Sequence, residues 1–71
     1  MEYKTLDSFI TKFNFTNGRL GSRIGVTREI VRQWRSGIGK PSKKNLEELR
    51  KVVSEYIKQD AAEFFPYKKS V

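Results

Sequence analysis

The side chains best suited to chemistry lie in one short stretch, GVTREIVRQWRS, residues 25–36. Polar and charged side chains alternate there with apolar ones at helical spacing. Arginine can bond guanine through two hydrogen bonds, glutamine can do the same with adenine, and glutamate can accept from cytosine. Hydrogen-bonded recognition of base edges is therefore one chemistry that these side chains could carry out. The candidate base-contacting residues are Thr27, Arg28, Glu29, Arg32 and Gln33.

Other kinds of chemistry lack the residues they need. The chain has no cysteine and no histidine, so the usual zinc ligands and the commonest general base are missing. At 71 residues it forms at most one domain with a thin core, which disfavours a deep active-site cleft. We expect no enzyme activity, no catalytic residue, no metal, no cofactor and no small-molecule ligand.

The net charge of +7 is confined to one segment. Residues 19–44 contain eight basic residues and one acidic residue, whereas the rest of the chain has seven of each. Such segregation is typical of a surface that binds a polyanion. The candidate phosphate-contacting residues are Thr16, Asn17, Arg19, Arg35, Lys40, Ser42, Lys43 and Lys44. For any single lysine the alternative is a solvated charge.

The apolar pattern predicts an all-α fold of four helices, with a fifth element left open at the end. The first covers about residues 5–13, and the second runs from Thr16 or Asn17 to Gly25. The third follows Thr27, and the fourth follows Ser42. The expected core positions are Leu6, Phe9, Ile10, Phe13, Leu20, Ile24, Val26, Ile30, Val31, Trp34, Leu46, Leu49, Val53, Tyr56 and Ile57. Lys43 and Lys44 would oppose the dipole of the fourth helix, which makes sense if an external anion binds there.

The segment NGRLGSRIGVTREIVRQWRS, residues 17–36, fits a helix-turn-helix. Gly21 stands where the two helices must cross closely, and Gly25 stands where the turn needs a positive φ. With the passage GIGKPSKKNLEEL that follows, the sequence resembles the phage repressor and Cro-type helix-turn-helix proteins over about residues 5–57. The chain departs from the family pattern at Gly18 and at Ile38, which we expect to pack between the third and fourth helices.

The resemblance implies a DNA-binding domain at residues 1–60, with the helix-turn-helix at 17–36. It places the third helix in the major groove, where the base-contacting residues named above would read sequence, with phosphate contacts around it. It also implies a homodimer, at least on DNA, that binds two half-sites about 34–36 Å apart. Repression of transcription is an expectation from the resemblance alone.

The tail, residues 61–71, carries three aromatic residues around a proline. Either these side chains fold back over the small core, or they form a symmetric contact with a second copy. We favour the second, which makes Phe64, Phe65 and Tyr67 the candidate dimer contacts.

Three residues of the helix-turn-helix have a possible role besides, or instead of, contact with DNA. Glu29 is spaced for an ion pair with Arg32 as well as for base recognition. Trp34 could stack on a base, but its place in the apolar stripe favours the core. Arg23 should face away from the groove, as a surface residue or as the partner of an acidic group elsewhere.

The function that the sequence favours is a sequence-specific regulator that binds operator sites in double-stranded DNA, most similar to a small Cro-like phage or prophage repressor. The alternatives are an excisionase-like or architectural DNA-binding protein, a protein-interaction module such as an antirepressor, and an RNA-binding role. No apolar run approaches the roughly 18 residues of a membrane span and no signal-peptide pattern is visible, so we expect a cytoplasmic, nucleoid-associated protein without membrane contact.

Overall fold

The computed structural model describes residues 5–66, which form a small all-helical domain. Its four helices are α1 (Leu6–Phe13), α2 (Asn17–Ile24), α3 (Arg28–Arg35) and α4 (Lys43–Ile57). The predicted all-α class with four helices is confirmed. Within the described range, no fifth helix and no named strand follow α4.

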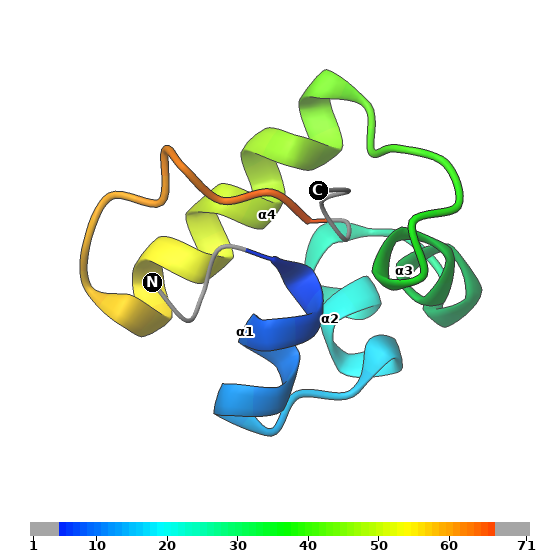
Figure 1. Ribbon diagram of the computed structural model, residues 1–71, viewed down its shortest axis with the longest axis horizontal. Coiled ribbons are helices and arrows are strands. Elements are labelled where there is room, and N and C mark those ends of the chain that lie inside the picture. Colours follow the sequence, from blue (N-terminus) through cyan, green and yellow to red (C-terminus); the bar gives the residue numbers. More distant parts are fainter. Residues whose placement is uncertain (1–4, 67–71) are drawn as a thin grey trace.

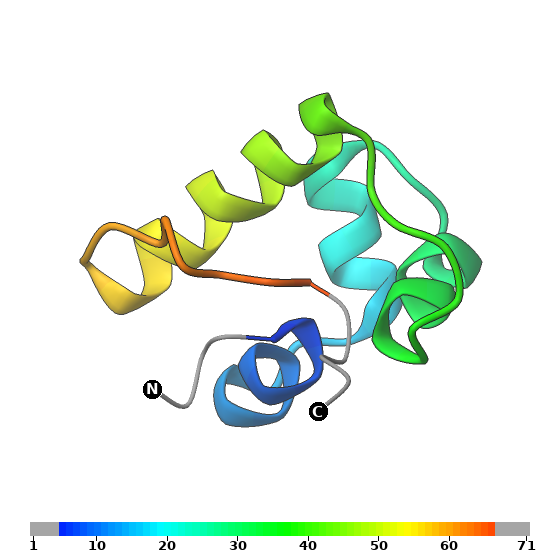
Figure 2. The same cartoon turned by 45° about the horizontal axis from the view of Figure 1, so that its top comes forward.

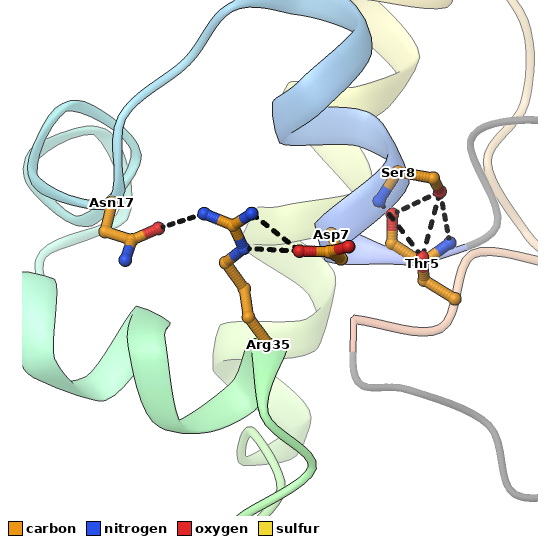
Figure 3. A network of polar contacts seen from close by, with 5 residues as sticks. All are labelled: Thr5, Asp7, Ser8, Asn17 and Arg35. Carbon is orange, nitrogen blue, oxygen red and sulfur yellow. Dashed lines mark hydrogen bonds and ion pairs between the residues drawn. The ribbon is translucent and has the colours of Figure 1, made fainter.

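Each helix begins at a hydroxyl residue whose oxygen accepts a hydrogen bond from the first turn. Thr5 accepts from the Ser8 N–H at 3.2 Å, and the Ser8 hydroxyl donates back to the Thr5 carbonyl, 3.0 Å away (Figure 3). The other N-caps are Thr16, Thr27 and Ser42. Such a cap stabilises a helix by about 1 kcal/mol relative to alanine. The helix starts expected after Thr27 and Ser42 are confirmed, and α2 begins at Asn17, one of the two starts expected for it.

Aromatic side chains from α1, α4 and the connections that follow them pack together in the core. Phe9 is fully buried, and its ring centroid lies 5.2 Å from that of Phe13, 5.4 Å from Phe15 and 5.8 Å from Tyr56. Phe15 is 7% exposed although it lies in the connection between α1 and α2, outside any helical pattern. Its burial was not predicted, because periodicity identifies core residues only within helices.

The segment after α4 folds back across the molecule instead of leaving it. In both views it turns at the end of α4 and returns toward the start of α1 (Figures 1 and 2). Phe65 forms an isolated parallel bridge with Thr5, and Phe64 packs edge to face on Phe9 with the ring centroids 6.4 Å apart. Phe64 is 2% exposed and Pro66 is fully buried. Residues 61–66 therefore complete the core that the helices leave open.

This packing corrects the prediction of a dimer contact at Phe64. Its side chain is buried inside its own chain, so it is not available to a second copy. The alternative of a tail that folds back over a small core holds for this residue. Phe65 is 37% exposed, and its dimer contact stays a prediction. Tyr67 lies outside the described residues.

Candidate nucleic-acid interface

The turn between α2 and α3, residues 25–27, holds the two helices close together. Gly25 has a φ of 82°, and the N–H groups of Gly25 and Val26 both donate to the Gly21 carbonyl, at 2.8 and 2.9 Å. A Cβ atom on Gly21 would lie 2.5 Å from the Val26 carbonyl oxygen. The close approach predicted at Gly21 and the positive φ predicted at Gly25 are confirmed. The orientation of α3 is therefore set by the backbone itself.

The buried face of α3 consists of Val31, which is fully buried, and Trp34, which is 4% exposed, with Ile30 partly buried beside them. The core position predicted for Trp34 is confirmed. The predicted base-contacting residues lie off this face: Thr27, Arg28, Glu29 and Arg32 are exposed, and Gln33 is half-buried. The structure thus brings these five side chains together along one short helix.

Two of these side chains bond each other. The Arg32 guanidinium contacts both carboxylate oxygens of Glu29, with 3.0 Å from Nε to each. Hydrogen bonding from Arg32 lowers the pKa of Glu29 below its ordinary value. The ion pair that the spacing allowed is therefore formed in the free protein, with both side chains about half exposed. In contrast, Arg28 forms no salt bridge within the described range, although its charge also helps to lower the pKa of Glu29.

The first turns of α2 and α4 carry no acidic residue, so nothing there offsets the positive end of the helix dipole. The Arg19 guanidinium carbon in α2 lies 5.2 Å from the centroid of the Phe15 ring. Lys43 and Lys44 are exposed in the first turn of α4 and form no ion pair within residues 5–66. The other exposed members of the predicted phosphate set are Thr16, Lys40 and Ser42.

Arg35 has a role in the fold that the sequence did not indicate. Its Nε and Nη2 donate to one carboxylate oxygen of Asp7 at 3.0 and 2.6 Å, and its Nη1 donates to the Asn17 side-chain oxygen at 2.9 Å (Figure 3). These bonds join α1, α2 and the end of α3. Arg35 and Asn17 were both expected to contact phosphate, and that stays a prediction. No sequence pattern around either residue predicts this bond, since Asp7 lies 28 residues from Arg35.

Arg23 pairs with Glu55 of α4 at 2.7 Å from Nη2 to Oε2. The expectation that Arg23 finds an acidic partner elsewhere is confirmed. Three of the eight basic residues of segment 19–44, Arg23, Arg32 and Arg35, are therefore paired with carboxylates.

The expectation for Ile38 is wrong. Its side chain is 56% exposed and does not join α3 to α4. Gly37 and Gly39 on either side have φ values of 81° and 73°, and the segment from α3 to α4 follows the outside of the molecule (Figure 1). The glycines turn this segment away from the core, so that Ile38 faces solvent.

Comparisons with protein families, curated proteins and solved structures found no match. Among residues 5–66, no helix combines the length and the apolar character that crossing a membrane requires. The functional interpretation of this surface therefore depends on the residues, charge and geometry of the chain itself.

Proposed function

We propose that this protein is a sequence-specific regulator that binds double-stranded DNA. The observation that carries the proposal is the outer side of α3, where Thr27, Arg28 and Glu29 are exposed on a helix whose other side is buried. A helix of this kind fits the major groove, which is about 12 Å wide in B-DNA. Because the backbone contacts at Gly21 fix α3 on α2, the helix backbone need not become ordered on binding, which lowers the entropic cost.

The distribution of charge supports the same proposal. The excess of seven positive charges lies in residues 19–44, which include all of α3 and the segments on either side of it. In this proposal α2 and α3 act as a helix-turn-helix, α3 reads base edges, and Arg19, Lys43 and Lys44 contact phosphates. Arg28 is the leading base-reading residue, since it is exposed on α3 and forms no salt bridge within the described range.

The finer proposal follows from the resemblance to Cro-type repressors. A homodimer on DNA would place two copies of α3 in successive major grooves, about 34–36 Å apart. It would repress transcription by occupying an operator that overlaps a promoter, in the cytoplasm of a bacterial host. Phe65 is the described residue that we propose for the dimer contact.

Selection of binding sites from a random duplex library tests the proposal. The purified protein is incubated with the library at two salt concentrations, and the bound duplexes are sequenced. We expect a two-fold symmetric motif with half-sites one helical turn apart. Salt-sensitive binding without a motif would favour an architectural protein, and an absence of binding would favour a protein partner.

A further inference from the structure

Ile38 is an apolar side chain presented to solvent by a fixed backbone. It is 56% exposed, the largest exposure among the large hydrophobic residues of the described chain. Its own N–H donates to the Gln33 carbonyl at 2.8 Å, and the Gly37 N–H donates to the Trp34 carbonyl at 3.1 Å. These bonds tie the start of the connecting segment to the last turn of α3. The exposed isoleucine is thus positioned relative to the helix that carries the proposed base-reading residues.

The residues that follow Ile38 are strongly basic. Lys40 lies two positions further along the same segment, and Lys43 and Lys44 open α4, all three being exposed. The segment follows the outside of the molecule from α3 to the start of α4 (Figure 1). An apolar side chain followed by cations matches the DNA backbone, in which anionic phosphates alternate with largely apolar deoxyribose rings.

We propose that Ile38 packs against deoxyribose carbons of duplex DNA, beside the phosphates that the neighbouring lysines bind. This inference rests on the proposed function and adds to it an apolar contact that does not depend on charge. A second copy of the chain is a poorer occupant, because a two-fold contact centred on Ile38 would bring like charges together. An anionic lipid surface also combines negative charge with apolar groups, but one isoleucine offers little apolar area for insertion into a membrane.

The salt dependence of binding separates an apolar contact from an ionic one. The dissociation constant of a duplex is measured over a range of salt concentrations for the wild-type protein, Ile38→Ala and Lys43→Ala. We expect Ile38→Ala to weaken binding about fivefold at every salt concentration, because it removes apolar contact without removing charge. Lys43→Ala should instead reduce the slope of log K against log salt by about 0.9.

The absence of cysteine from this chain allows a direct second measurement. Ile38→Cys introduces a single thiol, and its rate of alkylation is measured with and without a duplex. The matched control is Gln59→Cys, since Gln59 is exposed just after the end of α4, on the far side of the molecule from the segment of Ile38 (Figures 1 and 2). We expect the duplex to slow alkylation several-fold at position 38 and to leave position 59 unchanged.

The outcomes distinguish this inference from the proposed function. If the wild-type protein binds no duplex, the proposed function fails and the inference fails with it. If it binds but Ile38→Ala binds equally well and the thiol at position 38 stays reactive, only the inference is overturned. Two further results would overturn the inference. The first is that, without DNA, the thiol at position 38 becomes less reactive as the protein concentration rises, which would indicate contact with a second copy. The second is that phosphatidylserine vesicles slow its alkylation more than DNA does.

Discussion

The aromatic and the basic side chains of this protein lie in two different regions. Phe9, Phe15 and Phe64 join α1 and the returning segment in one buried cluster, with Tyr56 of α4 at its edge. The α2–α3 pair has Trp34 as its one aromatic residue, and polar or charged side chains cover its outer surface. Both regions bury apolar side chains in the same core, and α2 and α3 contribute Leu20, Val31 and Trp34. The α2–α3 pair is held in addition by a close backbone approach at Gly21 and by the bonds of Arg35.

The difference shows how a small chain can present a charged helix and still fold. A domain of this size buries only about 60% of the surface that its unfolded chain exposes, so few residues can supply its stability. Here the aromatic region adds Phe9, Phe15 and Phe64 to a core whose other members are mostly aliphatic. The outer side of α3 is then free to carry residues that contribute little to the core. Substitutions in the first region should change stability, and those on α3 should change binding.

The largest predicted effect is a loss of stability on substitution in the aromatic region. Phe64→Ala should lower the free energy of unfolding by about 3–5 kcal/mol, because it leaves a cavity next to Phe9. Urea unfolding followed by circular dichroism measures the change. Phe65→Ala is the control, since that side chain is partly exposed and should cost clearly less. Equal losses for the two variants would mean that the returning segment does not complete the core.

The next effect tests the backbone contact that joins α2 to α3. Gly21→Ala should lower the free energy of unfolding by about 2–3 kcal/mol, because its Cβ would lie 2.5 Å from a backbone oxygen. Gly18→Ala is the matched control in the same helix, where the nearest atom to a Cβ is 3.9 Å away. It should be neutral or stabilising by up to about 1 kcal/mol. Similar results at both positions would contradict a close crossing at Gly21.

A smaller effect, on binding alone, is expected on α3. Arg28→Ala should weaken binding to the selected DNA site by about 1–3 kcal/mol and relax the preference at one base pair. Lys43→Ala should weaken binding to all duplexes alike. Binding curves with the selected site and with point-substituted sites measure both, and urea unfolding should show unchanged stability. A uniform loss from Arg28→Ala would rule out its base-reading role.

The smallest predicted effect is on the pH dependence of stability, through the Glu29–Arg32 ion pair. Because the pKa of Glu29 is lowered in the folded protein, the unfolded chain binds the proton more readily, and the pair adds stability at neutral pH. That contribution should be lost as pH falls from the ordinary value of 4.5 through the folded value. The difference in thermal midpoint between the wild-type protein and Glu29→Gln should therefore be present at pH 7 and shrink below pH 4.5. A difference that persists at low pH would show that the variant acts in another way.

The features predicted correctly from the sequence are those that depend on near neighbours. A hydroxyl residue three positions before a backbone N–H, a glycine at a positive φ and a three- or four-residue apolar step all act within one or two helical turns. Thr27, Gly25 and the Val31–Trp34 stripe are examples, and the structure agrees with each. Val52 is an exception: it is 4% exposed on α4 but was not among the predicted core positions, although Val53 was.

The sequence by itself determined the four helices, their approximate starts, the close approach at Gly21 and the segment that holds the net charge. Only the tertiary structure decided that Phe64 is buried in its own chain and that Arg35 bonds Asp7 and Asn17. The physical reason is the distance along the chain between the residues involved. Helix starts and turns depend on hydrogen bonds between residues three to five positions apart, whereas the burial of Phe64 and the bonds of Arg35 depend on which distant segments come together when the core closes.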